Sequence, residues 1–113
     1  MPAKNFDNLQ PHILCKKGGI AKNVILPGDP GRVLRIAKLL DGGKEISFNR
    51  EFRVFTGKYK NIPITICSTG IGGPSTAIAI EELVALGAEN FIRVGSCGAN
   101  QTKIKIGDLI ISD

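Results

Sequence analysis

The chain has 113 residues, of which 42% are hydrophobic and 22% are charged, values typical of one soluble globular domain with a small core. Its net charge of +5 favours anionic ligands, although a solvated surface alone would account for this charge. The scattered lysines and few aromatic residues argue against nucleic-acid binding. Three distant cysteines without a CxxC pair indicate reduced thiols and a cytoplasmic location, and the absence of an apolar run of roughly 20 residues argues against a membrane partner.

The first elements are predicted from apolar runs and their flanking residues. Residues 1–20 predict an extended or short helical arm. Residues 23–28, NVILPG, predict a short buried strand, because their apolar run does not alternate with polar residues. Asp29 is a good N-cap and a proline follows it, so residues 30–40 predict an amphipathic helix. The Asp-Gly-Gly run at 41–43 is expected to end that helix.

The second half of the chain continues the alternation of strands and helices. Three strands are predicted in succession, over residues 44–49, 51–60 and 61–70. A glycine-rich turn then leads into a second helix over residues 74–87, which begins at a proline and ends at a glycine. Two further strands are predicted, a buried one over residues 90–98 and a last one over residues 104–112.

This order of elements is typical of an α/β fold whose sheet is at least partly parallel. We expect a mixed central sheet flanked by helices, a three-layer sandwich, with residues 1–113 forming part of a single domain. A doubly wound sheet normally covers an apolar strand such as residues 104–112 with further structure. We therefore expect the chain to be the front part of a larger, truncated domain.

Three apolar strands run directly into turns that contain glycine. They are VILPGDPGR at residues 24–32, ITICSTGIGGPS at 64–75 and FIRVGSCGA at 91–99. Ligands of open α/β sheets bind outside the carboxyl ends of the strands, where glycines let backbone N–H groups approach an anion and helix N-termini add a favourable dipole. The three turns are therefore expected to line one anion-binding crevice. Neither a complete dinucleotide fingerprint nor a Walker loop is present.

Two arginines accompany these turns. Arg32 lies in the first turn of the first helix, and Arg93 interrupts an apolar strand. A guanidinium group binds phosphate oxygens in pairs, and a charged residue in an apolar strand must reach a partner or leave the core. The alternatives are a plain surface position for Arg32 and a solvated strand-edge position for Arg93. Ser96 could add a hydroxyl donor.

A family resemblance rests on five motifs that occur in order: GDPGR, NREF, STGIGGPSTAIAIEEL, RVGSCGA and IKIGDLI. From Pro11 to Asp113 the chain resembles the N-terminal part of nucleoside phosphorylases of the purine and uridine phosphorylase family. The resemblance implies a pentosyltransferase of nucleoside salvage, which cleaves a nucleoside with phosphate into free base and ribose 1-phosphate. The motif at 68–83 is more similar to uridine phosphorylases and RVGSCGA to hexameric purine enzymes; we lean towards uridine.

The resemblance also implies roles for individual residues. Five residues would bind phosphate: Gly28, Arg32, Arg50, Arg93 and Ser96. Of these, Arg32 and Arg93 would be catalytic. The nucleoside would be contacted by His12, Cys97 and Gly98. A potassium ion would be held at a dimer interface by Glu51, Ile71 and Ser75. No other cofactor is expected, and phosphate is a co-substrate.

Arg50 and His12 would each complete the site of a neighbouring subunit. The resemblance therefore implies a homo-oligomer, either a hexamer or its dimer building block. Members of the family continue beyond residue 113 and carry the rest of the base pocket there. The alternative is a non-catalytic fragment that retains only the phosphate-binding or oligomer-forming surface.

Overall fold

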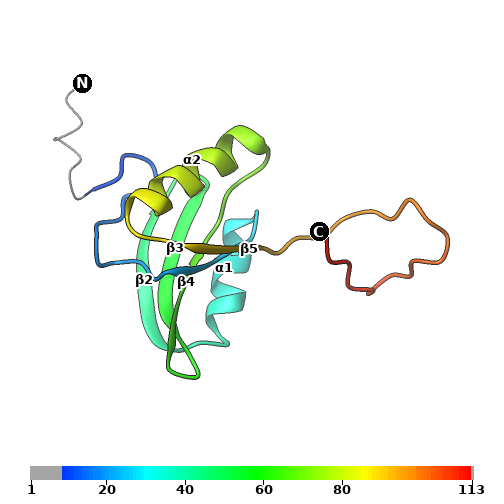
Figure 1. Ribbon diagram of the computed structural model, residues 1–113, viewed down its shortest axis with the longest axis horizontal. Coiled ribbons are helices and arrows are strands. Elements are labelled where there is room, and N and C mark those ends of the chain that lie inside the picture. Colours follow the sequence, from blue (N-terminus) through cyan, green and yellow to red (C-terminus); the bar gives the residue numbers. More distant parts are fainter. Residues whose placement is uncertain (1–8, 113) are drawn as a thin grey trace.

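The structure, a computed structural model, describes residues 9–112, which form a five-stranded mixed sheet with one helix on each face (Figure 1). Along the chain the elements are β1 (Asn23–Leu26), α1 (Pro30–Ala37), β2 (Asp41–Asn49), β3 (Phe52–Tyr59), β4 (Ile62–Cys67), α2 (Gly73–Ala85) and β5 (Asn90–Arg93). The sheet order is β2-β3-β4-β1-β5. β1 is parallel to both of its neighbours, whereas β2, β3 and β4 are joined by antiparallel pairings.

The unit β1–α1 forms as its sequence predicts. Asp29 is the N-cap of α1, and its carboxylate accepts a hydrogen bond from the Gly31 backbone N–H at 3.2 Å. Pro30 occupies the start of the helix, where no intrahelical donor is needed. This local chemistry turns the chain sharply at the carboxyl end of β1 and places Arg32 next to the turn.

The run 41–43 does not act as the helix stop that was predicted. α1 ends earlier, at Ala37, and β2 already begins at Asp41. Gly42 and Gly43 have φ angles of 61° and 95°, and a Cβ on Gly43 would overlap the Thr56 carbonyl oxygen of β3. The glycines therefore allow β2 to bend against its neighbour, where its register with β3 shifts.

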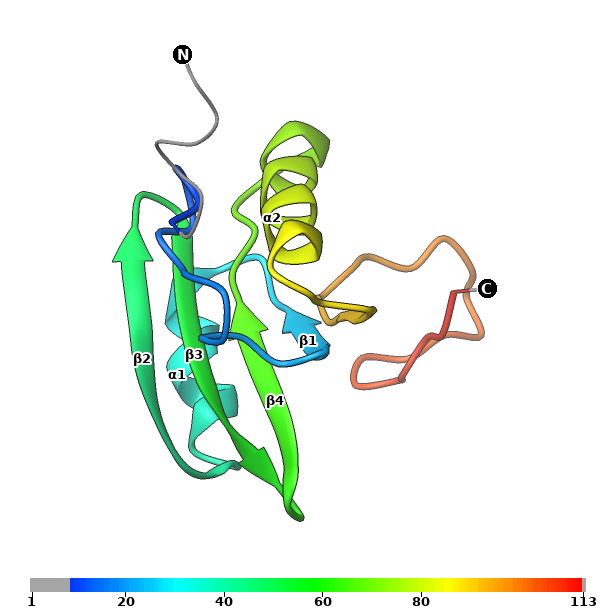
Figure 2. The same ribbon diagram turned by 60° about the vertical axis from the view of Figure 1, so that its left-hand side comes forward.

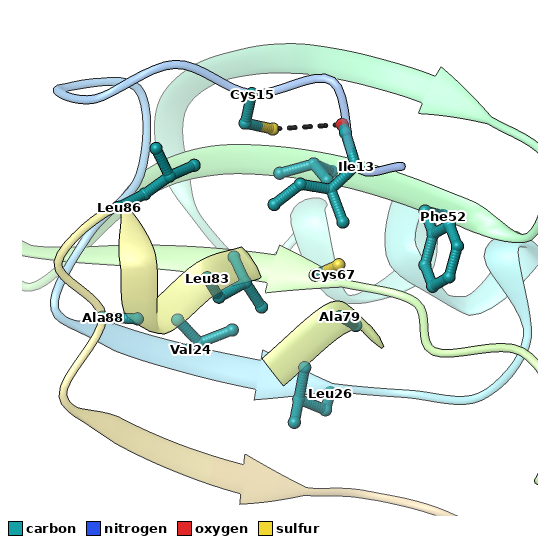
Figure 3. Packing of buried hydrophobic residues seen from close by; sticks show 11 residues of the cluster. Ile13, Cys15, Val24, Leu26, Phe52, Cys67, Ala79, Leu83, Leu86 and Ala88 are labelled. Carbon is teal, nitrogen blue, oxygen red and sulfur yellow. Dashed lines mark hydrogen bonds between the residues drawn. The ribbon is translucent and has the colours of Figure 1, made fainter. Parts of the chain in front are cut away.

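The two helices cover opposite faces of the sheet, as Figure 2 shows. On one face, α2 packs through Ala79 and Leu83 onto Val24, Leu26 and further apolar residues of the strands and of the arm before β1 (Figure 3). Of the arm predicted over residues 1–20, the first eight residues lie outside the described part of the chain. On the other face, α1 packs through Val33 and Ala37 onto Ile66. Alternate residues of β1 and β4 face the two layers, so the three-layer α/β sandwich expected from the sequence is confirmed.

α2 ends as the glycine at position 87 predicts. Gly87 has a φ of 104°, its N–H donates to the Val84 carbonyl, and the N–H of Ala88 donates to the Leu83 carbonyl. This is the Schellman arrangement, which satisfies the last carbonyl groups of a helix. Leu86 and Ala88 then return to the core on either side of the turn.

The predictions at the end of the chain were wrong in two respects. The predicted buried strand over residues 90–98 is reduced to β5, a short and mostly exposed strand at the sheet edge. Residues 104–112 form no strand; they belong to an irregular loop that leads away from β5 (Figures 1 and 2). A strand needs a paired backbone and a covered apolar face, whereas Ile106 and Leu109 are exposed here. Neither helix within residues 9–112 has the length and hydrophobicity needed to span a bilayer.

Candidate functional site

The carboxyl ends of β1, β4 and β5 meet at one edge of the sheet, as the sequence predicts for the three glycine turns. The Thr69 and Gly70 N–H groups donate to the carbonyls of Pro27 and Gly28 at 2.9 Å each. The Val94 N–H donates to the Leu26 carbonyl at 3.1 Å. These bonds extend the parallel pairing beyond the strands and hold the three turns side by side.

The turn between β2 and β3 lies at the same edge, because β3 runs antiparallel to β4. The Ser68 hydroxyl, just after β4, donates to the Glu51 carbonyl at 2.6 Å and accepts from the Arg53 N–H at 2.8 Å. The three glycine turns and the β2–β3 turn, which are far apart in the sequence, therefore lie close together. Here lies a cleft of about 890 Å³, lined by Gly28, Asp29, Pro30, Arg32, Glu51, Gly70, Ile71, Gly72, Thr76 and Arg93.

Gly28 lies between the two arginines of this cleft. A Cβ built on Gly28 would be 3.2 Å from Arg93 Nη2 and 3.9 Å from Arg32 Nη2. Arg93 Nη1 donates to the carbonyls of Leu26 and Val94 at 3.2 and 2.6 Å, which fixes the guanidinium over the turn. Within residues 9–112 neither arginine forms an ion pair. Two guanidinium groups without an ion-pair partner thus converge where the backbone has no side chain, a geometry suited to an anion.

The other residues expected to bind phosphate or nucleoside are not gathered in this cleft. Arg50 is exposed in the β2–β3 turn, one residue before Glu51, with a φ of 53°. Ser96, Cys97 and Gly98 lie in the loop after β5, where residues 95–99 and 104–110 enclose a separate hollow of about 500 Å³. Within this chain, therefore, only Gly28, Arg32 and Arg93 of the proposed phosphate residues line the same space.

The residues expected to hold potassium gather around Gly70. This glycine has a φ of 70°, and a Cβ on it would lie 2.6 Å from Glu51 Cγ and 3.0 Å from Ser75 Oγ. Ser75 Oγ donates to the Thr69 carbonyl, and the fully exposed Ile71 follows Gly70. A carboxylate, a hydroxyl and main-chain carbonyls are oxygen donors of the kind that a hard cation takes, so the residues present fit such an ion.

His12 lies beside the β2–β3 turn, held by a carboxylate that the sequence analysis overlooked. Its Nδ1 is 2.8 Å from Glu82 Oε2, and the N–H groups of His12 and Ile13 donate to Glu82 Oε1 at 2.8 and 3.1 Å. Asn49 Nδ2 donates to the His12 carbonyl at 2.8 Å. The sequence signal for this role is a carboxylate on the apolar face of α2: Glu82 stands three residues after Ala79 and directly before Leu83. A charged residue at such a position needs a partner.

The thiols near this carboxylate are unreactive in character. Burial, together with the neighbouring Cys15 and Glu82, raises the pKa of Cys67 from 9.0 to about 12. Burial also raises the pKa of Cys15, whereas its hydrogen bond with Ser47 lowers that pKa by a smaller amount. Cys97, by contrast, is exposed. A thiolate nucleophile is therefore not provided by the two core cysteines.

Comparison with known proteins shows the family to which the chain belongs. Residues 22–113 match the profile of the Phosphorylase superfamily. A uridine phosphorylase of Thermococcus kodakarensis is 62% identical over 106 residues, which are 94% of this chain and 38% of that protein. A guanosine phosphorylase of Halorubrum lacusprofundi is 48% identical over 103 residues, 91% of this chain and 43% of that protein.

A solved structure extends the likeness to three dimensions. The crystal structure of a uridine phosphorylase from Vibrio fischeri superimposes with a TM-score of 0.87 at 50% identity, covering 89% of this chain and 42% of that one. The chain thus spans about two fifths of the length of these relatives.

Proposed function

The chain belongs to the Phosphorylase superfamily, and from this membership together with the cleft we propose that it acts as a nucleoside phosphorylase. The reaction cleaves the N-glycosidic bond of a nucleoside with inorganic phosphate. An oxygen of phosphate forms a bond to the anomeric carbon of the sugar, while the bond to the base breaks and its electron pair leaves with the base. The products are free base and ribose 1-phosphate.

The observation that carries this proposal is the pair of arginines at Gly28. Their guanidinium groups approach one point of the cleft and have no carboxylate partner within residues 9–112. A phosphate dianion placed there would have its charge offset and its oxygens oriented before it meets the sugar. A hydrolase that uses water has no need for such a cradle, so the geometry favours phosphorolysis.

The remaining assignments complete the site as the family resemblance implies. Arg50 and Ser96 would add phosphate contacts, and His12, Cys97 and Gly98 would contact the nucleoside. Arg50 and His12 are both at least partly exposed beside the β2–β3 turn, which suits contributions to a neighbouring subunit in a dimer or hexamer. A cytoplasmic location agrees with the three free cysteines.

Substrate and ion follow from the same reasoning. Uridine is the preferred nucleoside, because the relative at 62% identity is a uridine phosphorylase, whereas the guanosine phosphorylase is 48% identical. Glu51, Ile71 and Ser75 would hold a potassium ion at the subunit interface. Such an ion would compensate the negative charge that Glu51 places at the edge of an anion-binding cleft.

The test is base release from uridine and from inosine by the purified chain, with and without phosphate. Release that requires phosphate would support phosphorolysis, and Arg93→Ala should then lower it by about a hundred-fold or more, the scale of removing a transition-state charge contact. Arg35→Ala, on the exposed face of α1, is the matched control. Equal release without phosphate would contradict phosphorolysis. Phosphate binding without release would identify a chain that keeps only the phosphate-binding surface.

A further inference from the structure

The only histidine of the chain is tied to a nearly buried carboxylate. Glu82 lies on the face of α2 that packs against the sheet, and its side chain is 10% exposed, whereas the side chain of His12 is 42% exposed. Three hydrogen bonds join the two residues and their neighbour: two from backbone N–H groups of the arm to Oε1, and one between Nδ1 of His12 and Oε2. Glu82 is not among the residues proposed to contact phosphate, the nucleoside or potassium.

These contacts define which nitrogen of His12 carries the proton. An ionised carboxylate only accepts hydrogen bonds, and Glu82 already accepts two from the backbone of the arm. Its third contact therefore requires a proton on Nδ1 of His12. In the neutral ring the other nitrogen, Nε2, is then an acceptor. No hydrogen bond within residues 9–112 uses Nε2.

The position of the ring is fixed as well as its tautomer. Phe52 meets the His12 ring edge-on, with ring centroids 6.4 Å apart. Asn49 holds the His12 carbonyl, and the Ser47 hydroxyl donates to the Ile13 carbonyl at 2.5 Å. The arm is thus anchored on both sides of His12, so that Nδ1 is held against Glu82 while the side chain remains partly exposed.

We propose that Glu82 is a positioning residue, which holds His12 with Nδ1 as donor so that Nε2 accepts a hydrogen bond from a hydroxyl group of the nucleoside sugar. The part that concerns the sugar rests on the proposed function. The part that concerns the tautomer stands on the geometry of this chain alone. Glu82 itself does not touch the ligand; it acts through His12.

The tautomer is directly measurable, because the chain contains one histidine. We expect the nitrogen NMR spectrum of the labelled chain, recorded where the ring is neutral, to show a proton on Nδ1 and none on Nε2. In Glu82→Gln the amide oxygen can still accept from the arm, while the amide NH₂ replaces Oε2 and donates to Nδ1. The tautomer should then reverse. Glu81→Gln, an exposed neighbour on α2, should leave it unchanged.

The outcomes separate this inference from the proposed function. A proton on Nε2 in the unmodified chain, or an unchanged tautomer in a folded Glu82→Gln, would overturn the positioning role; if that variant does not fold, the spectrum of the unmodified chain decides. Uridine should shift the Nε2 signal, and free uracil, which has no sugar hydroxyl, should not. A correct tautomer with no response to uridine would overturn the sugar contact and leave the positioning of His12 by Glu82 standing.

Discussion

Replacing Gly28 with alanine inserts one methyl group at the point where the two arginines converge. The new Cβ would lie 3.2 Å from Arg93 Nη2, 3.5 Å from the Gly70 carbonyl and 3.9 Å from Arg32 Nη2. The first distance is tight, but the end of an arginine side chain can shift by a few tenths of an ångström. Gly28 does not have a positive φ, so its backbone accepts alanine. We therefore expect the free energy of unfolding to change by less than about 1 kcal/mol.

The effect on phosphate should be much larger. A phosphate oxygen that bonds both guanidinium groups must come within roughly 2.9 Å of a nitrogen of each, and the methyl group would occupy that space. Losing one charge-assisted hydrogen bond costs about 1.5–3 kcal/mol. The Kd for phosphate should therefore rise by roughly ten- to a hundred-fold.

Isothermal titration of phosphate into the chain measures this change, and the phosphate-induced rise in Tm provides a second readout. Gly73→Ala is the matched control, because a Cβ there meets nothing within 4 Å. Binding of phosphate to Gly28→Ala within two-fold of the unmodified chain would refute the assignment of the anion to the space between Arg32 and Arg93.

Three further predictions concern stability and the thiols. Gly70→Ala should destabilise the fold by about 1–3 kcal/mol in denaturant titration, because it combines a positive φ with overlap against Glu51; a change within ±0.5 kcal/mol would show that the loop adapts freely. A thiol reagent should label Cys97 in the folded chain, and Cys15 and Cys67 only after denaturation, as counted by mass spectrometry; rapid labelling of all three would contradict the packing of the core. Because folding raises the pKa of Cys67 from 9.0 to about 12, the unfolded chain loses the thiol proton at lower pH than the folded chain does. The contribution of Cys67 to the free energy of unfolding should therefore be constant below pH 9 and fall by about 1.4 kcal/mol per pH unit between the two values. Cys67→Ala should reduce this slope and Cys97→Ala should not.

The strand and helix boundaries near Gly28 and Gly87 could be predicted because they depend on local chemistry. A capping aspartate followed by proline starts α1, and a glycine with positive φ ends α2, through bonds within one turn of the chain. The same holds for the candidate site in outline. Parallel strands bring their carboxyl ends to one edge, so glycine turns after such strands indicate a shared crevice before any coordinates are known.

What the tertiary structure alone decided are the contacts between residues distant in the chain. His12 and Glu82 are 70 residues apart, and neither periodicity nor motif pairs them. The separation of Ser96 and Cys97 from the cleft is likewise a property of the loop path after β5. The apolar residues 104–112 have the composition of a strand, but a strand forms only where a partner supplies hydrogen bonds and a covering layer. The amino-acid sequence by itself therefore determined most of the elements and the edge of the sheet where the glycine turns meet, because these follow from short-range preferences. The meeting of Arg32 with Arg93 at Gly28, and of Glu82 with His12, required the packed sheet and helices.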